Sequence, residues 1–311
     1  MNFYSGKVGF AVGTGRCGTK FLARILEKEP GVSSVHERNP TNETFHRYCK
    51  WYGLPVDQEG FLHTKELEIR LDLESNCFSF ESSAHLSLSI LELYDRFKPK
   101  FILLVRSPER VVNSYFRKGI YEEPVIRKDP DLALGYQELG PVHHFLGRIV
   151  PSGEAYREWS MMTRIGKLSW WWNEINTAVL DQFQQIPESS WRVERLEELD
   201  FERYLKLSNF LGIQPELDES IYQQITERRP NALPNVPSIS DWKEREIKEY
   251  EQQVRPMAEK LGYEYRVSRL KAPSQRRRSS SREPILSGRR FVIALNRAAQ
   301  AFQQWTSSLL E

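Results

Sequence analysis

The stretch VGFAVGTGRCGTKFLARIL, residues 8–26, constrains the fold of this chain more than any other. The apolar run 8–12 predicts a buried strand, and the loop that follows carries three glycines in six residues. Apolar residues then recur at the spacing of one buried helix face. This order of elements leaves backbone N–H groups free at a helix N-terminus, where they bind anions. The stretch therefore predicts an anion site, with Arg16 supplying a fixed positive charge.

The glycine spacing also fits the P-loop of nucleotide triphosphatases, G-x-x-x-x-G-K-[ST]. Here the second glycine is followed by Thr19 and Lys20 in the reverse order. The lysine is displaced by about 100° around the helix, and the metal-binding hydroxyl is out of place. A second apolar strand at 101–105 ends in Arg106, where a triphosphatase places a metal-binding aspartate. These departures predict phosphate binding without a metal, and a kinase or triphosphatase is the alternative.

A second anion-binding group follows the strand at 101–105. Ser107 suits a helix N-cap and Pro108 suits the first helical position, so a helix is expected to begin immediately after Arg106. Ser114 lies about two turns into that helix. Its hydroxyl is placed to share a ligand with the Arg106 side chain.

The glycine loop and the Arg106–Ser114 pair together resemble the two phosphate-binding signatures of sulfotransferases that use 3′-phosphoadenosine-5′-phosphosulfate (PAPS). The resemblance covers residues 6–266 and implies a three-layer α/β/α fold with a central parallel sheet, of the P-loop NTPase-like kind. It implies that Arg106 and Ser114 hold the 3′-phosphate of PAPS, and that the loop grips the 5′-phosphosulfate. The implied loop contacts are Gly13, Thr14, Gly15, Arg16, Cys17, Gly18 and Thr19, with positive potential added by Lys20.

The resemblance also implies metal-independent, in-line transfer of a sulfuryl group to a hydroxyl or amine, which releases adenosine 3′,5′-bisphosphate. Arg16 is the candidate that stabilises the leaving group. Glu37, which follows a predicted strand at 32–36, is the candidate general base, and it needs a pKa raised by burial to act near neutral pH. His36 is the rival base. Since neighbours on a strand point to opposite faces, only one of the two is expected to serve.

Two further residues are candidates near this site. Cys17 replaces the usual serine or threonine of the loop and either packs as a neutral thiol or reacts as a thiolate, because a helix N-terminus lowers a thiol pKa. Glu81, at the end of a strand predicted at 76–80, is a second candidate on the acceptor side.

The remaining segments alternate between strand and helix patterns, which indicates parallel βαβ units with ligands at the carboxyl edge of the sheet. Residues 41–75 are expected to be irregular, with short helices on the substrate side. The irregular stretch 118–167 is expected to form a lid or a substrate loop. A helix is predicted at 164–183, and its three consecutive tryptophans, 170–172, are not expected to face one core together.

The predicted organisation is an α/β domain at 1–270, a basic Ser/Arg-rich linker at 271–290 and an amphipathic helix at 291–311. Residues 271–311 carry a net charge of +6, within a total of +2, so the rest of the chain is acidic and no nucleic-acid partner is expected. The narrow apolar seam of the last helix suits either packing, by docking onto the core or by self-association, or a membrane surface. The acceptor is expected to be a small molecule, a carbohydrate or a lipid.

Three widely spaced cysteines indicate neither a disulfide framework nor a metal cluster. No secretion signal and no apolar run of about 20 residues is present. A soluble, cytoplasmic enzyme is therefore expected, with attachment to membranes through the C-terminal helix left open. The third hypothesis is a non-catalytic, sulfotransferase-like binding protein.

Overall fold

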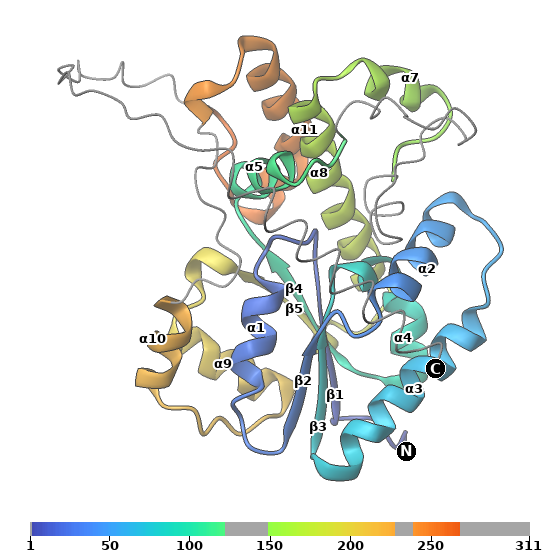
Figure 1. Cartoon of the computed structure of the whole chain (residues 1–311), viewed down its shortest axis with the longest axis vertical. Coiled ribbons are helices and arrows are strands. Elements are labelled where there is room, and N and C mark those ends of the chain that lie inside the picture. Colours follow the sequence, from blue (N-terminus) through green and yellow to red (C-terminus); the bar gives the residue numbers. More distant parts are fainter. Residues whose placement is uncertain (1, 122–148, 228–238, 268–311) are drawn as a thin grey trace, which may run out of the picture. The chain divides into compact units, whose positions relative to one another are not determined.

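The computed structural model describes residues 2–121, 149–227 and 239–267 (Figure 1). The predictions for the linker at 271–290 and the helix at 291–311 lie outside these residues, as does the middle of the expected lid. Up to Val267 the chain forms one compact unit.

The centre of this unit is a sheet of five parallel strands in the order β2-β3-β1-β4-β5. The strands are β1 (Val8–Val12), β2 (Val32–His36), β3 (Phe78–Ser82), β4 (Lys100–Val105) and β5 (Trp191–Arg195). The strands predicted at 8–12, 32–36 and 101–105 are confirmed. The third strand lies at 78–82 and not at 76–80 as predicted, so Glu81 lies within it.

Helices cover both faces of the sheet, as the fold prediction requires (Figure 1). One layer contains α1 (Thr19–Leu26), α9 (Phe201–Leu211) and α10 (Glu219–Glu227); the other contains α3 (Gln58–Ser75), α4 (Ile90–Phe97) and α8 (Arg164–Phe183). Strands β1 and β4 are apolar at nearly every position, and alternate residues of β4 enter two separate cores: Phe101 and Leu103 pack with the second layer, Ile102 and Leu104 with the first. Burial on both faces is the reason for these continuous apolar runs, and it confirms the three-layer α/β/α architecture.

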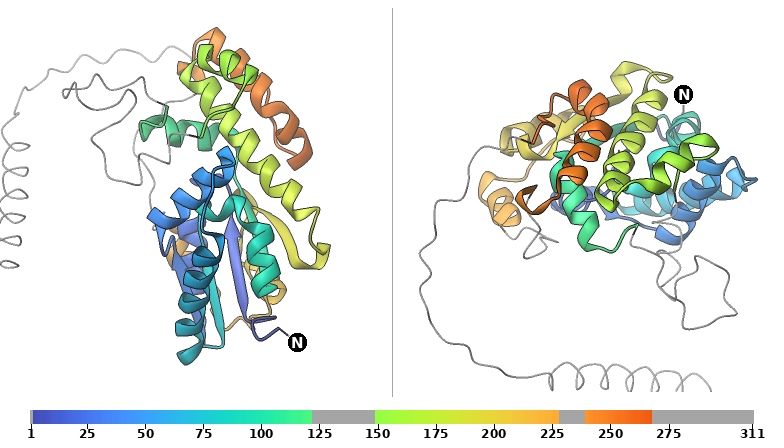
Figure 2. Two further views of the ribbon diagram at one scale, coloured as in Figure 1. Left: turned by 90° about the vertical axis from the view of Figure 1, so that its right-hand side faces the viewer. Right: turned by 90° about the horizontal axis from the view of Figure 1, so that it is seen from above.

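Most of the remaining elements lie on the carboxyl side of the sheet, but the turn at Glu188–Ser190 directly precedes β5 and lies at the amino edge. These elements are α2 (Pro40–Tyr52), α5 (Pro108–Arg117), α7 (Glu154–Met161), α11 (Glu244–Leu261), and the short 3-10 turns η1 (Ala84–Leu88), η2 (Glu188–Ser190), η3 (Leu196–Glu198) and η4 (Ile239–Asp241). Helix α11 packs along α8, as both views of Figure 2 show. No helix in the described part of the chain is long and apolar enough to span a bilayer.

The prediction of an irregular segment at 41–75 is wrong. Two regular helices, α2 and α3, fill it. Gly53, with a left-handed φ of 62°, caps the end of α2. Asp57 caps the start of α3, where its carboxylate accepts a hydrogen bond from the Gly60 N–H at 2.8 Å. Both are standard helix-ending and helix-starting devices.

The expectation that the three tryptophans of α8 could not share a core is also wrong. Trp170, Trp171 and Trp172 are all buried, because α8 is enclosed by α5, α11 and the sheet. Two of the indoles also bind the edge of the sheet: Trp171 Nε1 donates to the Thr14 carbonyl at 3.3 Å, and Trp172 Nε1 donates to the Arg106 carbonyl at 3.1 Å.

Candidate active site

The glycine loop that follows β1 is held tightly by its own protein neighbours. Gly15 has a φ of 80°, and a Cβ there would lie 2.2 Å from the Tyr115 hydroxyl. That hydroxyl donates to the Thr14 carbonyl at 2.5 Å. At Gly18, with a φ of 102°, a Cβ would lie 2.6 Å from Leu196 Cδ1. The glycines are therefore needed to close the loop against α5 and η3, which fixes its backbone in advance of any ligand.

The structure brings together the two anion-binding groups predicted at the ends of β1 and β4. Arg16 Nε donates to Ser114 Oγ at 2.7 Å, and this hydrogen bond joins the glycine loop to α5. An Nη of Arg106 donates to the Arg16 carbonyl at 3.1 Å. Arg16 itself has a φ of 58°, a strained conformation for a residue with a side chain. Residues from the glycine loop, the end of β4 and α5 thus form one basic cluster.

This basic cluster has a surplus of positive charge. Burial lowers the pKa of Arg106, and the neighbouring charges of Arg110 and Arg16 lower it further, although Glu197 opposes them. Arg106 Nε is buried and has no hydrogen-bond partner among the described residues. Crowded cations with an unused buried donor favour binding of an anion.

The N-terminus of α1 follows the glycine loop directly. Its N-cap, Gly18, offers no side-chain acceptor, and the first turn holds no acidic residue. Its N–H groups and the positive end of the helix dipole are therefore available to an anion. Thr19 and Lys20 follow in α1, but both associate with His36: Thr19 Oγ1 lies 3.1 Å from His36 Nε2, and the Lys20 charge helps to lower the His36 pKa.

The reactive-thiol reading of Cys17 is wrong. The side chain is fully buried, and burial raises its pKa to about 11 in spite of hydrogen bonds from the loop. The thiol therefore packs in the core as a neutral group, and its place at a helix N-terminus does not activate it.

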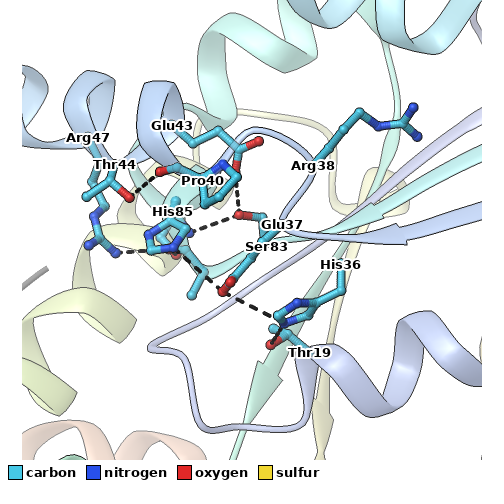
Figure 3. A network of polar contacts seen from close by, with 12 residues as sticks. Thr19, His36, Glu37, Arg38, Pro40, Glu43, Thr44, Arg47, Ser83 and His85 are labelled. Atoms are coloured by element: carbon cyan, nitrogen blue, oxygen red, sulfur yellow. Dashed lines mark hydrogen bonds and ion pairs between the residues drawn. The ribbon is translucent and has the colours of Figure 1, made fainter. Parts of the chain in front are cut away.

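The Glu37 carboxylate lies between two imidazoles, as Figure 3 shows. Its Oε1 is 3.7 Å from His36 Nε2 and 3.6 Å from His85 Nε2. The expectation that His36 and Glu37 point to opposite faces is wrong, because Glu37 stands just past the strand with a left-handed φ of 51°. That turn of the backbone brings consecutive side chains together.

The protonation states around Glu37 suit a base. Burial raises the pKa of Glu37, and the charge of Glu43 raises it further; Lys118, Arg47 and Lys20 oppose the shift. Burial lowers the pKa of His36 to about 4 and that of His85 to about 3. Near neutral pH both imidazoles are therefore neutral, while Glu37 is the group whose pKa is moved toward the working range.

Two residues of this region were not predicted as site residues, His85 and Arg47. His85 follows β3 in η1, where its N–H is capped by Ser83 Oγ at 3.2 Å. The pattern Ser83-x-His85 after an apolar strand was available as a signal, but the predicted strand ended too early to use it. Arg47, on α2, carries no sequence signal of this kind.

Glu81 does not lie on an acceptor surface, contrary to its prediction. It is buried inside β3, where its carboxylate accepts hydrogen bonds from Lys65 Nζ at 2.8 Å and from the Arg38 N–H at 3.0 Å. Lys65 Nζ also binds Glu43 at 2.6 Å and Glu68 at 3.0 Å. Burial and the charge of Glu43 raise the Glu81 pKa to about 8, so this cluster holds a proton at neutral pH.

No group of three His, Cys, Asp or Glu side chains in the described part of the chain is arranged to hold a metal ion. A pocket of about 480 Å³ lies between α3 and α4, lined by residues such as Leu62, Leu91 and Arg96. It contains none of the residues placed around the glycine loop or Glu37.

Comparison with known proteins finds similarity in structure but not in sequence. No family model matches the chain, and no curated protein matches it. The chain is similar to the sulfotransferase domain of the Synechococcus PCC 7002 olefin synthase, with a TM-score of 0.43 and 13% identity over 84% of this chain and 96% of that one. It is also similar to the sulfotransferase domain of the curacin biosynthetic pathway (TM-score 0.42, 14% identity, 83% and 98% covered) and to a sulfotransferase from Alicyclobacillus acidocaldarius (0.42, 15%, 82% and 96%).

Proposed function

We propose that this protein is a sulfotransferase that moves a sulfuryl group from PAPS to a hydroxyl or amine. The observation that carries the proposal is the junction of the two anion-binding groups, in which Arg16 contacts Ser114 and Arg106 contacts the Arg16 backbone. A ligand with phosphates at two positions needs two anion sites at a fixed separation. PAPS has such a pair, at the 5′ and 3′ positions.

The residues present fit this cofactor. The N-terminus of α1 and the loop suit the 5′-phosphosulfate, since backbone N–H groups and the helix dipole favour an anion there. Arg106 and Ser114 suit the 3′-phosphate, and the unpartnered Arg106 Nε is a donor that this phosphate would satisfy.

When bound, PAPS supplies the sulfuryl group and a phosphate leaving group. Glu37 Oε1 accepts the proton that the acceptor hydroxyl or amine loses as it attacks. Arg16 would stabilise the negative charge of the phosphate group that leaves on transfer. Lys118 adds positive potential; partial desolvation lowers its pKa, and the charge of Arg16 lowers it further.

Binding and transfer assays test this proposal. Adenosine 3′,5′-bisphosphate should raise the melting temperature, while ATP with Mg²⁺ should not. Labelled sulfate should pass from PAPS to a compound in a cell extract, and Glu37→Gln and Arg16→Ala should abolish the transfer. Stabilisation by ATP with Mg²⁺ instead would favour the kinase alternative. Bisphosphate binding without any transfer would favour a binding protein.

A further inference from the structure

Arg47 is a buried cation that the proposed reaction does not use. It lies on α2 and is 1% exposed. One Nη donates to the Ala84 carbonyl at 3.2 Å, but its Nε and second Nη have no hydrogen-bond partner among the described residues. A guanidinium stays charged in a protein. Two of its donor nitrogens are thus desolvated without compensation, which is costly.

Other cations of the same region are paired. Arg38 binds both oxygens of Asp72, at 2.6 and 3.1 Å, and the buried ammonium of Lys65 is surrounded by three carboxylates. Arg47 thus differs from its neighbours. A buried donor left unsatisfied in this way calls for a reason, and a missing ligand is one.

The surroundings of Arg47 show where such a ligand would lie. The guanidinium is 5.2 Å from the ring centre of Trp171, the tryptophan that donates to the Thr14 carbonyl of the glycine loop. The Trp171 ring is 6.2 Å from that of Tyr115 and 6.3 Å from that of Tyr121. On its other side Arg47 stands beside His85, next to the Glu37 carboxylate (Figure 3).

We propose that Arg47 binds an acidic group of the sulfuryl acceptor, so that the acceptor is a hydroxyl- or amine-bearing organic acid. This inference rests on the proposed function, since it places the acceptor's reacting group at Glu37. A planar guanidinium with two unused donors matches a carboxylate, or an ester of phosphate or sulfate, in a two-pronged contact. The rings of Trp171, Tyr115 and Tyr121 provide an apolar wall for the body of the molecule.

The stability of Arg47→Met tests whether Arg47 is there for a ligand. An arginine that serves only the fold destabilises the protein when it is removed. Arg47→Met in the ligand-free protein should instead melt at the same or a higher temperature than the wild type, because an uncompensated charge is lost and the volume is kept. The matched control, Arg38→Met, should melt lower because it breaks the pair with Asp72. A loss of stability in Arg47→Met like that in Arg38→Met overturns the proposal.

Binding of paired probes tests the chemistry of the ligand. Protein saturated with adenosine 3′,5′-bisphosphate is titrated with 4-hydroxyphenylacetate, with its uncharged analogue tyrosol and with inorganic sulfate. The acid should bind about 10-fold or more tightly than tyrosol, the size expected for a hydrogen bond between charged groups. Arg47→Gln should abolish that difference, and Arg47→Lys should restore part of it.

The other outcomes are decisive against the proposal. Equal binding of the acid and tyrosol, or a preference that persists in Arg47→Gln, shows that Arg47 does not recognise an acidic group. Inorganic sulfate that binds as tightly as the acid shows a simple anion site rather than an acceptor site. Failure of the bisphosphate to bind refutes the proposed function instead, and the acid titration on the ligand-free protein then still measures the anion preference of Arg47.

Discussion

The two halves of the carboxyl edge of the sheet are built in different ways. At the ends of β1 and β4 the main charged groups, Arg16 and Arg106, are basic, and each stands between a strand end and the helix that follows it in sequence. At the ends of β2 and β3 the polar groups are carboxylates and imidazoles, held by buried partners from α2 and α3. The first half is suited to bind anions, and the second to accept a proton. Transfer chemistry needs both.

The largest expected effect separates these two roles at Glu37. Glu37→Gln should lower the rate of sulfuryl transfer by about 10²–10⁴-fold, the range for a lost general base. Its affinity for adenosine 3′,5′-bisphosphate should be unchanged, because the basic half is intact. Transfer kinetics and calorimetric titration measure the two quantities.

His36→Gln is the control for that experiment. It should reduce transfer less than Glu37→Gln, because the imidazole is held neutral and already shares a hydrogen bond with Thr19. A larger loss in His36→Gln would move the base to the imidazole.

The next effect concerns the buried charges behind Glu37. Lys65→Met should lower the free energy of unfolding by about 3–5 kcal/mol, since it leaves buried carboxylates without their cation. Glu81→Gln should be neutral or stabilising at pH 7, because the pKa of about 8 already keeps this carboxyl protonated there. Urea unfolding of both variants compares the two. A large loss of unfolding free energy in Glu81→Gln would show that Glu81 is ionised within the cluster of carboxylates around Lys65.

A smaller effect is expected in the glycine loop. Gly15→Ala should cost about 1–3 kcal/mol of stability, because it adds a left-handed alanine that collides with Tyr115. It should also weaken nucleotide binding by displacing the loop. Gly53→Ala is the matched control: φ there is 62° and no atom lies within 4 Å, so only backbone strain is added. If Gly15→Ala and Gly53→Ala bind the nucleotide with equal affinity, the shape of the glycine loop does not contribute to nucleotide binding.

The smallest effect is a pH dependence that comes from His36. Burial lowers its folded-state pKa from 6.5 to about 4, so between these values the unfolded chain binds a proton that the folded protein does not. The free energy of unfolding should therefore decrease as the pH is lowered. At pH 5.5 the wild type should have lost about 1 kcal/mol more than His36→Gln, each relative to its own value at neutral pH. The exposed His63 provides the control variant, His63→Gln, which should keep the wild-type pH profile. Parallel unfolding curves for wild type and His36→Gln across this range would contradict the assignment.

The same contrast explains what the sequence could predict. The glycine loop, Arg106 and Ser114 lie in local patterns whose geometry follows from a strand end and a helix start. The Arg16–Ser114 contact then follows from the parallel neighbours β1 and β4. On the other side, Glu81, Lys65 and Arg47 owe their environment to residues distant in sequence. No periodicity shows that a charged residue of α2 or α3 is buried.

The remaining wrong predictions concern Glu37, Cys17 and the tryptophans of α8, and each has its cause in local backbone geometry or in packing. The left-handed turn at Glu37 overrides the alternation of side chains expected from a strand, and it brings Glu37 beside His36. Cys17 is inert because the loop folds over it, which no propensity encodes. The tryptophans of α8 are all buried because α8 is covered on several sides, whereas an amphipathic pattern assumes one buried face.

The affinity ratio between adenosine 3′,5′-bisphosphate and adenosine 5′-monophosphate tests most directly whether the basic groups at the ends of β1 and β4 bind one nucleotide. The 3′-phosphate should strengthen binding by about 10-fold or more in the wild type, as expected for hydrogen bonds to a charged group. That gain should largely disappear in Arg106→Ala and shrink in Ser114→Ala, while the exposed neighbour variant Arg110→Ala keeps most of it. A wild-type ratio near unity, or a gain that survives in Arg106→Ala, would show that the ends of β1 and β4 do not bind one doubly phosphorylated nucleotide.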